Sequence, residues 1–94
     1  MMANLTEMRN SMSKIYKEPI KAETETTINV LYSENILSVY TNKVDLQRRL
    51  NRLIGEPTKE YKIKRSISGS LWKIPLNDKS KINKIILKAN IYDE

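Results

Sequence analysis

The chain has 94 residues, carries 17 Lys and Arg against 11 Asp and Glu, and contains neither histidine nor cysteine. These absences exclude disulfides, thiolate zinc sites, cysteine nucleophiles and every catalytic pair that uses histidine. No apolar run approaches the roughly 18 residues of a membrane span, and no signal-peptide core follows the start. We therefore expect one small cytoplasmic domain that is not an enzyme, binds no cofactor or metal, and does not enter a membrane.

Composition also bears on origin and assembly. Lys, Ile and Asn together supply 33 of the 94 residues, a bias that indicates an AT-rich coding genome such as that of a bacterium, phage or mobile element. A chain of this length builds only a small core, and association into a homodimer is an ordinary way to bury more surface.

Residues 4–16 place apolar side chains at helical spacing, and Asn4 with Glu7 has the form of a capping box. This pattern predicts an N-terminal helix. The stretch up to residue 25 is polar and contains Pro19, which is typical of a linker.

Residues 26–41 predict a β-hairpin that turns at Ser33-Glu34-Asn35, with Leu37 and Val39 on one face and Ile36 and Tyr40 on the other. A helix follows, capped by Asn42, and Gly55 and Pro57 end it. Its apolar stripe consists of Leu46, Leu50, Leu53 and Ile54.

The pattern then recurs. Residues 59–67 and 71–76 predict a second hairpin that turns at Ser68-Gly69-Ser70, and Asn77 or Asp78 caps a last helix. The side chains expected to face inward are Tyr61, Ile63, Ile67, Trp72, Ile74 and Leu76. Arg65 also points inward by this parity, toward Glu60, the Trp72 ring or solvent at an edge, while Trp72 is expected to anchor the core.

The predicted fold class is α+β, with an N-terminal helix followed by tandem ββα units. In this fold a four-stranded antiparallel sheet carries helices on one face. The expected divisions of the single domain are residues 1–25, 26–57 and 58–94. The repeat has two possible origins: duplication of one unit, or the sequence pattern that all hairpin-helix units share.

Basic side chains form two groups of interest. Arg48, Arg49 and Arg52 lie on the middle helix away from its leucines, and Lys62, Lys64 and Lys73 lie on the hairpin face opposite Ile63 and Ile74. In one register Lys64 and Lys73 are directly opposite each other, a position in which like charges are destabilising unless they are solvated or bound to an anion. Residues 59–88 hold nine basic and two acidic groups, so the positive charge belongs to the second unit.

Residues 13–19 read SKIYKEP at the expected end of the first helix. The predicted order α-ββ-α-ββ-α resembles, in topology and over residues 4–90, a LAGLIDADG homing-endonuclease half-domain, whose saddle-shaped sheet sits on DNA. The motif of that family ends the first helix with an acidic residue flanked by glycine, which this segment lacks. No metal-binding acid carries over, so the resemblance does not imply nuclease activity.

The charge pattern fits two classes of partner. The leading hypothesis is a small basic, non-enzymatic module that binds nucleic acid through Lys62, Lys64 and Lys73, aided by the arginines of the middle helix. The alternative is a protein-interaction domain, an inhibitor or assembly factor of a phage or mobile element, that binds an acidic partner surface. Both classes use lysine-rich faces, so the sequence does not separate them.

Overall fold

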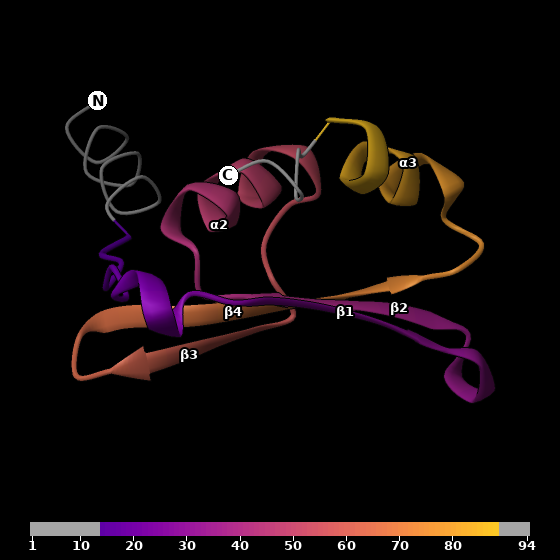
Figure 1. Ribbon diagram of the computed structural model, residues 1–94. Helices are drawn as coiled ribbons and strands as arrows, with labels where there is room; N and C mark the ends of the chain where they lie inside the picture. The colour runs from indigo at the N-terminus through magenta and orange to yellow at the C-terminus, as the bar shows by residue number, and fades with distance from the viewer. Residues whose placement is uncertain (1–13, 89–94) are drawn as a thin grey trace, which may run out of the picture.

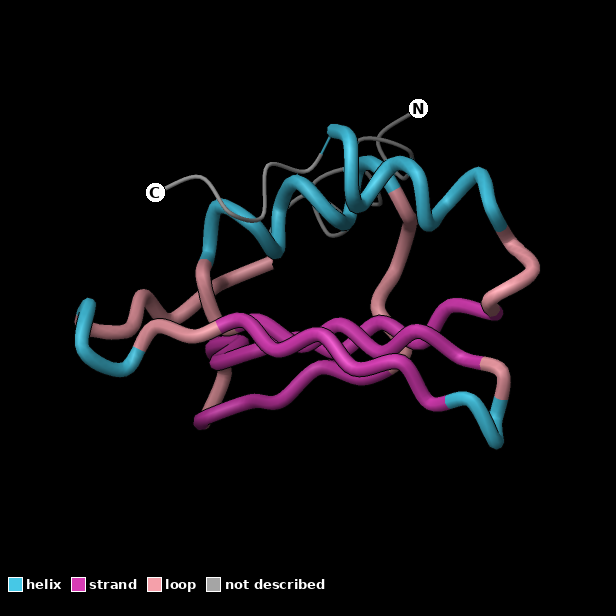
Figure 2. Tube along the Cα trace, turned by 45° about the vertical axis from the view of Figure 1, so that its right-hand side comes forward, coloured by secondary structure: helices cyan, strands magenta, loops and turns pink. Residues whose placement is uncertain are grey.

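The computed structural model of the protein describes residues 14–88, which form an antiparallel sheet with two helices over one of its faces (Figure 1). The elements are β1 (Thr26–Leu31), β2 (Ile36–Thr41), α2 (Val44–Leu53), β3 (Lys59–Ile63), β4 (Ser66–Pro75) and α3 (Lys79–Lys88). The four strands are ordered β1-β2-β4-β3. The predicted α+β class with a four-stranded antiparallel sheet is therefore confirmed. Figure 2 shows both helices in one layer against the sheet.

The predicted N-terminal helix over residues 4–16 lies outside the described residues except for its last three positions, and these are not helical. Tyr16 instead bridges in parallel to Ile67. The Ile67 N–H donates to the Ile15 carbonyl at 2.7 Å, and the Lys17 N–H donates to the Ile67 carbonyl at 2.9 Å. β2 pairs with β4 only over residues 70–75 of β4. Residues 15–17 therefore make the backbone hydrogen bonds that Ile67 of β4 would otherwise lack on that side.

The first hairpin and the helix after it follow the sequence prediction closely. Asn35 adopts a left-handed conformation at φ 57° after a short 3-10 turn, and Gly55 at φ 119° follows the end of α2. The cap is one difference, because Lys43 rather than Asn42 precedes the first helical residue. The Asn42 side chain instead accepts from the Glu25 N–H and donates to the Glu23 carbonyl, both at 2.8 Å, and so holds the start of β1.

The core lies between the two central strands and the helices. Leu37 pairs with Ile74 and Val39 with Trp72 across β2 and β4, which places all four side chains on the helix side. Leu46 and Leu50 of α2 and Ile85 of α3 complete the buried cluster, and its members are at most 7% exposed. Burial of Trp72 and Ile74 confirms the inward face predicted for them, and Leu37 and Val39 share one face as predicted.

The second hairpin turns at Lys64 and Arg65, not at Ser68-Gly69-Ser70 as the sequence predicts. Ile63 pairs with Ser66 across this two-residue turn, and Lys64 takes the left-handed conformation at φ 58°. β4 consequently runs straight through the Ser-Gly-Ser segment. Arg65 is exposed in the turn, so the prediction that it points inward is wrong.

A one-residue shift in register decides which side chains of β3 face the helices. Tyr61 pairs with Gly69 but Lys62 pairs with Ile67, so Ser68 is an extra residue in β4. Side chains alternate between the two faces of the sheet along each strand. Counted from the turn, one extra residue in β4 therefore reverses which β4 side chains share a face with a given residue of β3. Glu60 therefore shares the helix side with its partner Ser70, and Tyr61 points to the opposite side. The inward orientation predicted for Tyr61 and Ile63 is wrong for this reason.

Candidate functional site

The helix-free face is the side of the sheet that points away from α2 and α3 (Figure 2). No helix within residues 14–88 covers it. Its side chains alternate along each strand with those that face the helices. The face consists of Thr27, Asn29 and Leu31 of β1, Ile36, Ser38 and Tyr40 of β2, Ser66, Gly69, Leu71, Lys73 and Pro75 of β4, and Lys59, Tyr61 and Ile63 of β3.

Two tyrosines meet on this face, Tyr40 of β2 and Tyr61 of the edge strand β3. The ring centroids of Tyr40 and Tyr61 are 5.7 Å apart at an interplanar angle of 75°, an edge-to-face contact. Gly69 provides the space, because a Cβ at that position would lie 2.5 Å from the Tyr40 hydroxyl and 2.8 Å from its Cε1. The glycine that resembles a turn signal in the sequence thus serves a close side-chain approach.

Burial raises the pKa of Tyr40, and electrostatic interactions with Glu25 and Tyr61 raise it further. The Tyr40 hydroxyl therefore keeps its proton throughout the neutral range and remains a hydrogen-bond donor. Glu25 lies just before β1, at the margin of the helix-free face. The tyrosine pair thus offers aromatic surface and a neutral hydroxyl group to a ligand.

Two lysines of this face, Lys59 and Lys73, lie on the same side of Tyr61 along the strands. The Lys59 Nζ lies 4.8 Å from the centroid of the Tyr61 ring, a cation–π contact. Lys73 is diagonal to Lys59 across the β3–β4 pair, a position that sets their Cα atoms about 7–8 Å apart. Among the described residues, neither lysine forms an ion pair. The four strands contain one acidic residue, Glu60, and it faces the helices.

The three predicted hairpin lysines do not share one face. Lys73 lies on the helix-free face with Ser38 as its partner in β2, whereas Lys62 has the opposite parity in β3 and Lys64 lies in the turn. Lys64 and Lys73 are therefore not opposite each other, and the register that would have paired them is wrong. Lys59, which the sequence reasoning missed, takes the place beside Lys73.

The predicted arginines belong to α2, on the other side of the sheet (Figure 1). Arg48 lies over the Tyr16 ring, with its guanidinium carbon 5.4 Å from the centroid. Arg49 is half-buried, and Arg52 is exposed in the last turn of the helix. The structure therefore does not bring these arginines together with Lys73.

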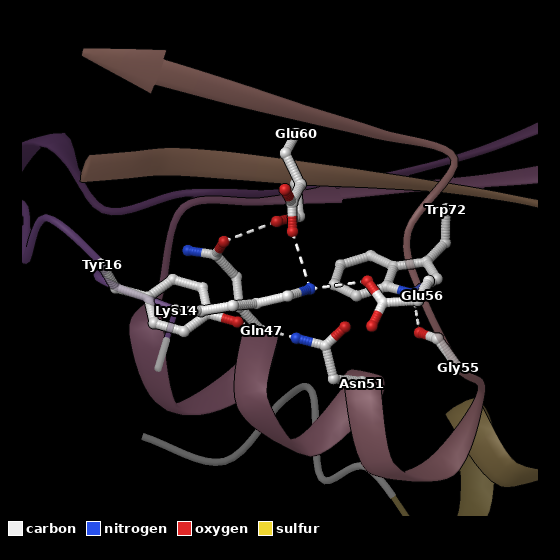
Figure 3. A network of polar contacts seen from close by, with 9 residues as sticks. Lys14, Tyr16, Gln47, Asn51, Gly55, Glu56, Glu60 and Trp72 are labelled. Carbon is white, nitrogen blue, oxygen red and sulfur yellow. Dashed lines mark hydrogen bonds and ion pairs between the residues drawn. The ribbon is translucent and has the colours of Figure 1, made fainter. Parts of the chain in front are cut away.

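A second polar cluster joins the N-terminal segment to α2 and β3 (Figure 3). The Lys14 Nζ lies 2.7 Å from a carboxylate oxygen of Glu56 and 2.7 Å from one of Glu60. The Tyr16 hydroxyl accepts a hydrogen bond from the Asn51 amide at 2.7 Å. Burial lowers the pKa of Lys14, but the hydrogen bonds and charges of the two carboxylates outweigh it and raise the pKa above its ordinary value.

This cluster fastens residues 14–17 to the domain and explains why Glu60 tolerates its inward position. Below it, Gln47 is fully buried and accepts a hydrogen bond from the Ser70 hydroxyl at 2.6 Å. Lys14 lies between the two carboxylates and offsets one of their two negative charges within the chain. No local sequence pattern predicts this cluster, because its members come from distant segments.

Metal-binding and membrane-spanning features are absent from the described part of the chain. No group of three or more Asp or Glu side chains within residues 14–88 is placed to hold a metal ion. Neither helix described there has the length and apolar character required to cross a bilayer.

Comparison with known proteins finds no matching family model, no matching curated protein and no matching solved structure. The resemblance to a LAGLIDADG half-domain therefore stays a similarity of predicted element order, and most of its first element lies outside the described residues. Function has to be argued from the helix-free face itself.

Proposed function

We propose that the protein is a small, non-enzymatic, cytoplasmic module that binds nucleic acid through the helix-free face of its sheet. The observation that carries this proposal is that Lys59 and Lys73 share a face with Tyr40 and Tyr61, and no acidic strand residue points to that face. Ammonium groups neutralise backbone phosphates, and aromatic rings offer surface to bases. The net charge of +6 gives the chain a general attraction for polyanions.

Different lysines have different parts in this proposal. Lys59 and Lys73 contact phosphates at the tyrosine pair. Lys62 and Lys64 are exposed at the adjacent end of the β3–β4 hairpin and extend the positive potential beyond the face. The arginines of α2 are left outside the proposed site, because α2 lies across the sheet from it.

A salt series tests the proposal. Binding of a labelled oligonucleotide is measured by fluorescence anisotropy between about 50 and 200 mM salt for the wild type and for a Lys59→Gln/Lys73→Gln variant. We expect weaker binding and a log-log salt slope that is smaller by about 0.7 for each single-strand phosphate contact removed. The matched control is Lys79→Gln/Lys84→Gln, which removes the same charge from α3.

Affinity and slope equal to the wild type in the Lys59→Gln/Lys73→Gln variant would remove the support for this proposal. The alternative, a domain that binds an acidic protein surface, is favoured by apolar side chains exposed near the end of the second hairpin. Ile63 is 51% exposed there, and Ile15, whose carbonyl accepts from Ile67, is 57% exposed. Binding of polyglutamate as tight as that of the oligonucleotide would favour the alternative.

A further inference from the structure

The tyrosine pair occupies an unusual position for large aromatic side chains. Three separate features place it there: the register shift that turns Tyr61 away from the helices, the absence of a Cβ at Gly69, and the edge-to-face contact with Tyr40. Tyr61 remains 37% exposed, and within residues 14–88 no helix covers either ring. The aromatic surface is thus presented to the outside instead of contributing to the core.

We infer that the helix-free face binds single-stranded nucleic acid in preference to a duplex, with one base stacked on Tyr61 and phosphates on one side of that base held by Lys59 and Lys73. This inference rests on the proposed function and specifies its ligand. Charge complementarity selects the occupant, because the face combines two lysines without an ion pair with aromatic surface and no acidic strand residue.

The contact of Lys59 with Tyr61 shows how one nucleotide fits. The ammonium group lies 4.8 Å from the ring centroid, on a ring face that a base needs for stacking. A base that stacks there displaces the ammonium group, and the adjacent phosphate then pairs with it. The ring thus exchanges a cation–π contact for base stacking, which is the stronger interaction by alanine substitution.

Ring geometry limits the site to one stacked base. The Tyr40 and Tyr61 planes differ by 75°, so two consecutive bases stacked parallel to each other cannot lie flat on both rings. Tyr40 contacts Tyr61 in this edge-to-face arrangement, and the protonated Tyr40 hydroxyl can donate to a base or phosphate oxygen.

A duplex cannot stack a base on the tyrosines of this face. Its bases are already stacked inside the double helix, and it presents phosphates and groove edges to a flat sheet. The lysines gain the same phosphate contacts from either ligand, whereas the tyrosines gain only from a strand whose bases turn outward. The preference for single strands therefore depends on the tyrosines and not on the lysines.

The experiment compares oligothymidylate with a duplex of equal phosphate number at one salt concentration. The variants are Tyr61→Leu and, as a matched control, Tyr32→Leu, which makes the same change at a side chain that is 82% exposed in the β1–β2 turn. We expect Tyr61→Leu to weaken single-strand binding by about tenfold or more, with an unchanged salt slope and unchanged duplex binding. Thermal melts establish that both variants fold.

A second readout uses the wild-type protein alone. Stacking places the Tyr61 ring protons in the ring current of a base, so their NMR resonances shift upfield on addition of oligothymidylate and stay in place on addition of the duplex. Equal binding of both nucleic acids, together with wild-type behaviour of Tyr61→Leu, would overturn the inference. The proposed function would survive that result if Lys59→Gln/Lys73→Gln still weakened binding, and both would fall if neither nucleic acid bound.

Discussion

The two faces of the sheet are made by alternate residues of the same strands, yet they differ in almost every property. On the helix side Leu37, Val39, Trp72 and Ile74 are buried against α2 and α3. On the helix-free side the neighbouring positions are more mixed, with Ile36 and Leu71 beside Tyr40, Ser38 and Lys73. The buried core lies on the helix side alone, which leaves the helix-free side available for binding. Substitutions on each face should therefore have separable effects.

The largest expected effect comes from emptying the helix side. Trp72→Ala and Leu50→Ala should each lower the free energy of unfolding by about 2–5 kcal/mol, because each removes a fully buried side chain and leaves a cavity. Trp72→Ala also removes the indole N–H that donates to the Gly55 carbonyl at 3.0 Å. Urea denaturation measures both changes. A wild-type midpoint for either variant would show that the core has been assigned to the wrong side chains.

A smaller loss of stability is expected from Gly69→Ala on the helix-free side. The added Cβ would approach the Tyr40 ring within 3 Å, and displacing the ring should cost about 1–3 kcal/mol. The cost should largely vanish in a Tyr40→Ala background, where the space is open. A double-mutant cycle of denaturation measurements tests this coupling. Equal cost in both backgrounds would place the constraint in the backbone of β4 instead.

A smaller effect on stability is expected from the Lys14 cluster, in which Lys14 stabilises the inward position of Glu60. Lys14→Met should cost about 1 kcal/mol or less at neutral pH. Since the pKa of Lys14 is raised above 10.5, its contribution is fully present below pH 10.5 and is lost as the pH rises through the folded-state value. Denaturation at several pH values should show the advantage of the wild type shrinking in strongly alkaline solution. An advantage that grows there would contradict the ion-pair assignment.

The smallest change in stability is expected for Lys59→Gln/Lys73→Gln, the variant that should affect binding most directly. Both side chains are exposed, so we expect a change of about 0.5 kcal/mol or less in the free energy of unfolding. Chemical denaturation and oligonucleotide titration of the same preparation compare the two effects. A large loss of stability would show that the helix-free face contributes to folding and is not reserved for a ligand.

Elements specified by local patterns could be predicted from the sequence. The leucine stripe of α2, the left-handed Asn35 and the stop at Gly55 each depend on neighbouring residues alone. Asp78 likewise caps α3 as expected, since its carboxylate accepts from the Lys81 N–H at 3.2 Å.

The second hairpin could not be predicted in the same way. Ser68-Gly69-Ser70 carries the residues that turns favour, whereas the real turn holds Lys64 in a left-handed conformation that lysine rarely adopts. The extra residue at Ser68 reverses the faces of β3, and that shift is set by pairing between strands rather than by local sequence. Because of this shift, the lysines that share a face with the tyrosines are Lys59 and Lys73, and not the predicted set of Lys62, Lys64 and Lys73.

The most direct test of the central claim maps the ligand onto the two sides of the sheet. Backbone amide resonances of the isotopically labelled protein are followed by NMR as oligothymidylate is added. If the ligand binds the helix-free face, the largest chemical-shift changes should fall on Tyr40, Tyr61, Gly69 and their neighbours on that face. The amide resonances of α2 and α3 should change little. Shifts centred on the arginines of α2, or no shifts at all, would contradict the claim.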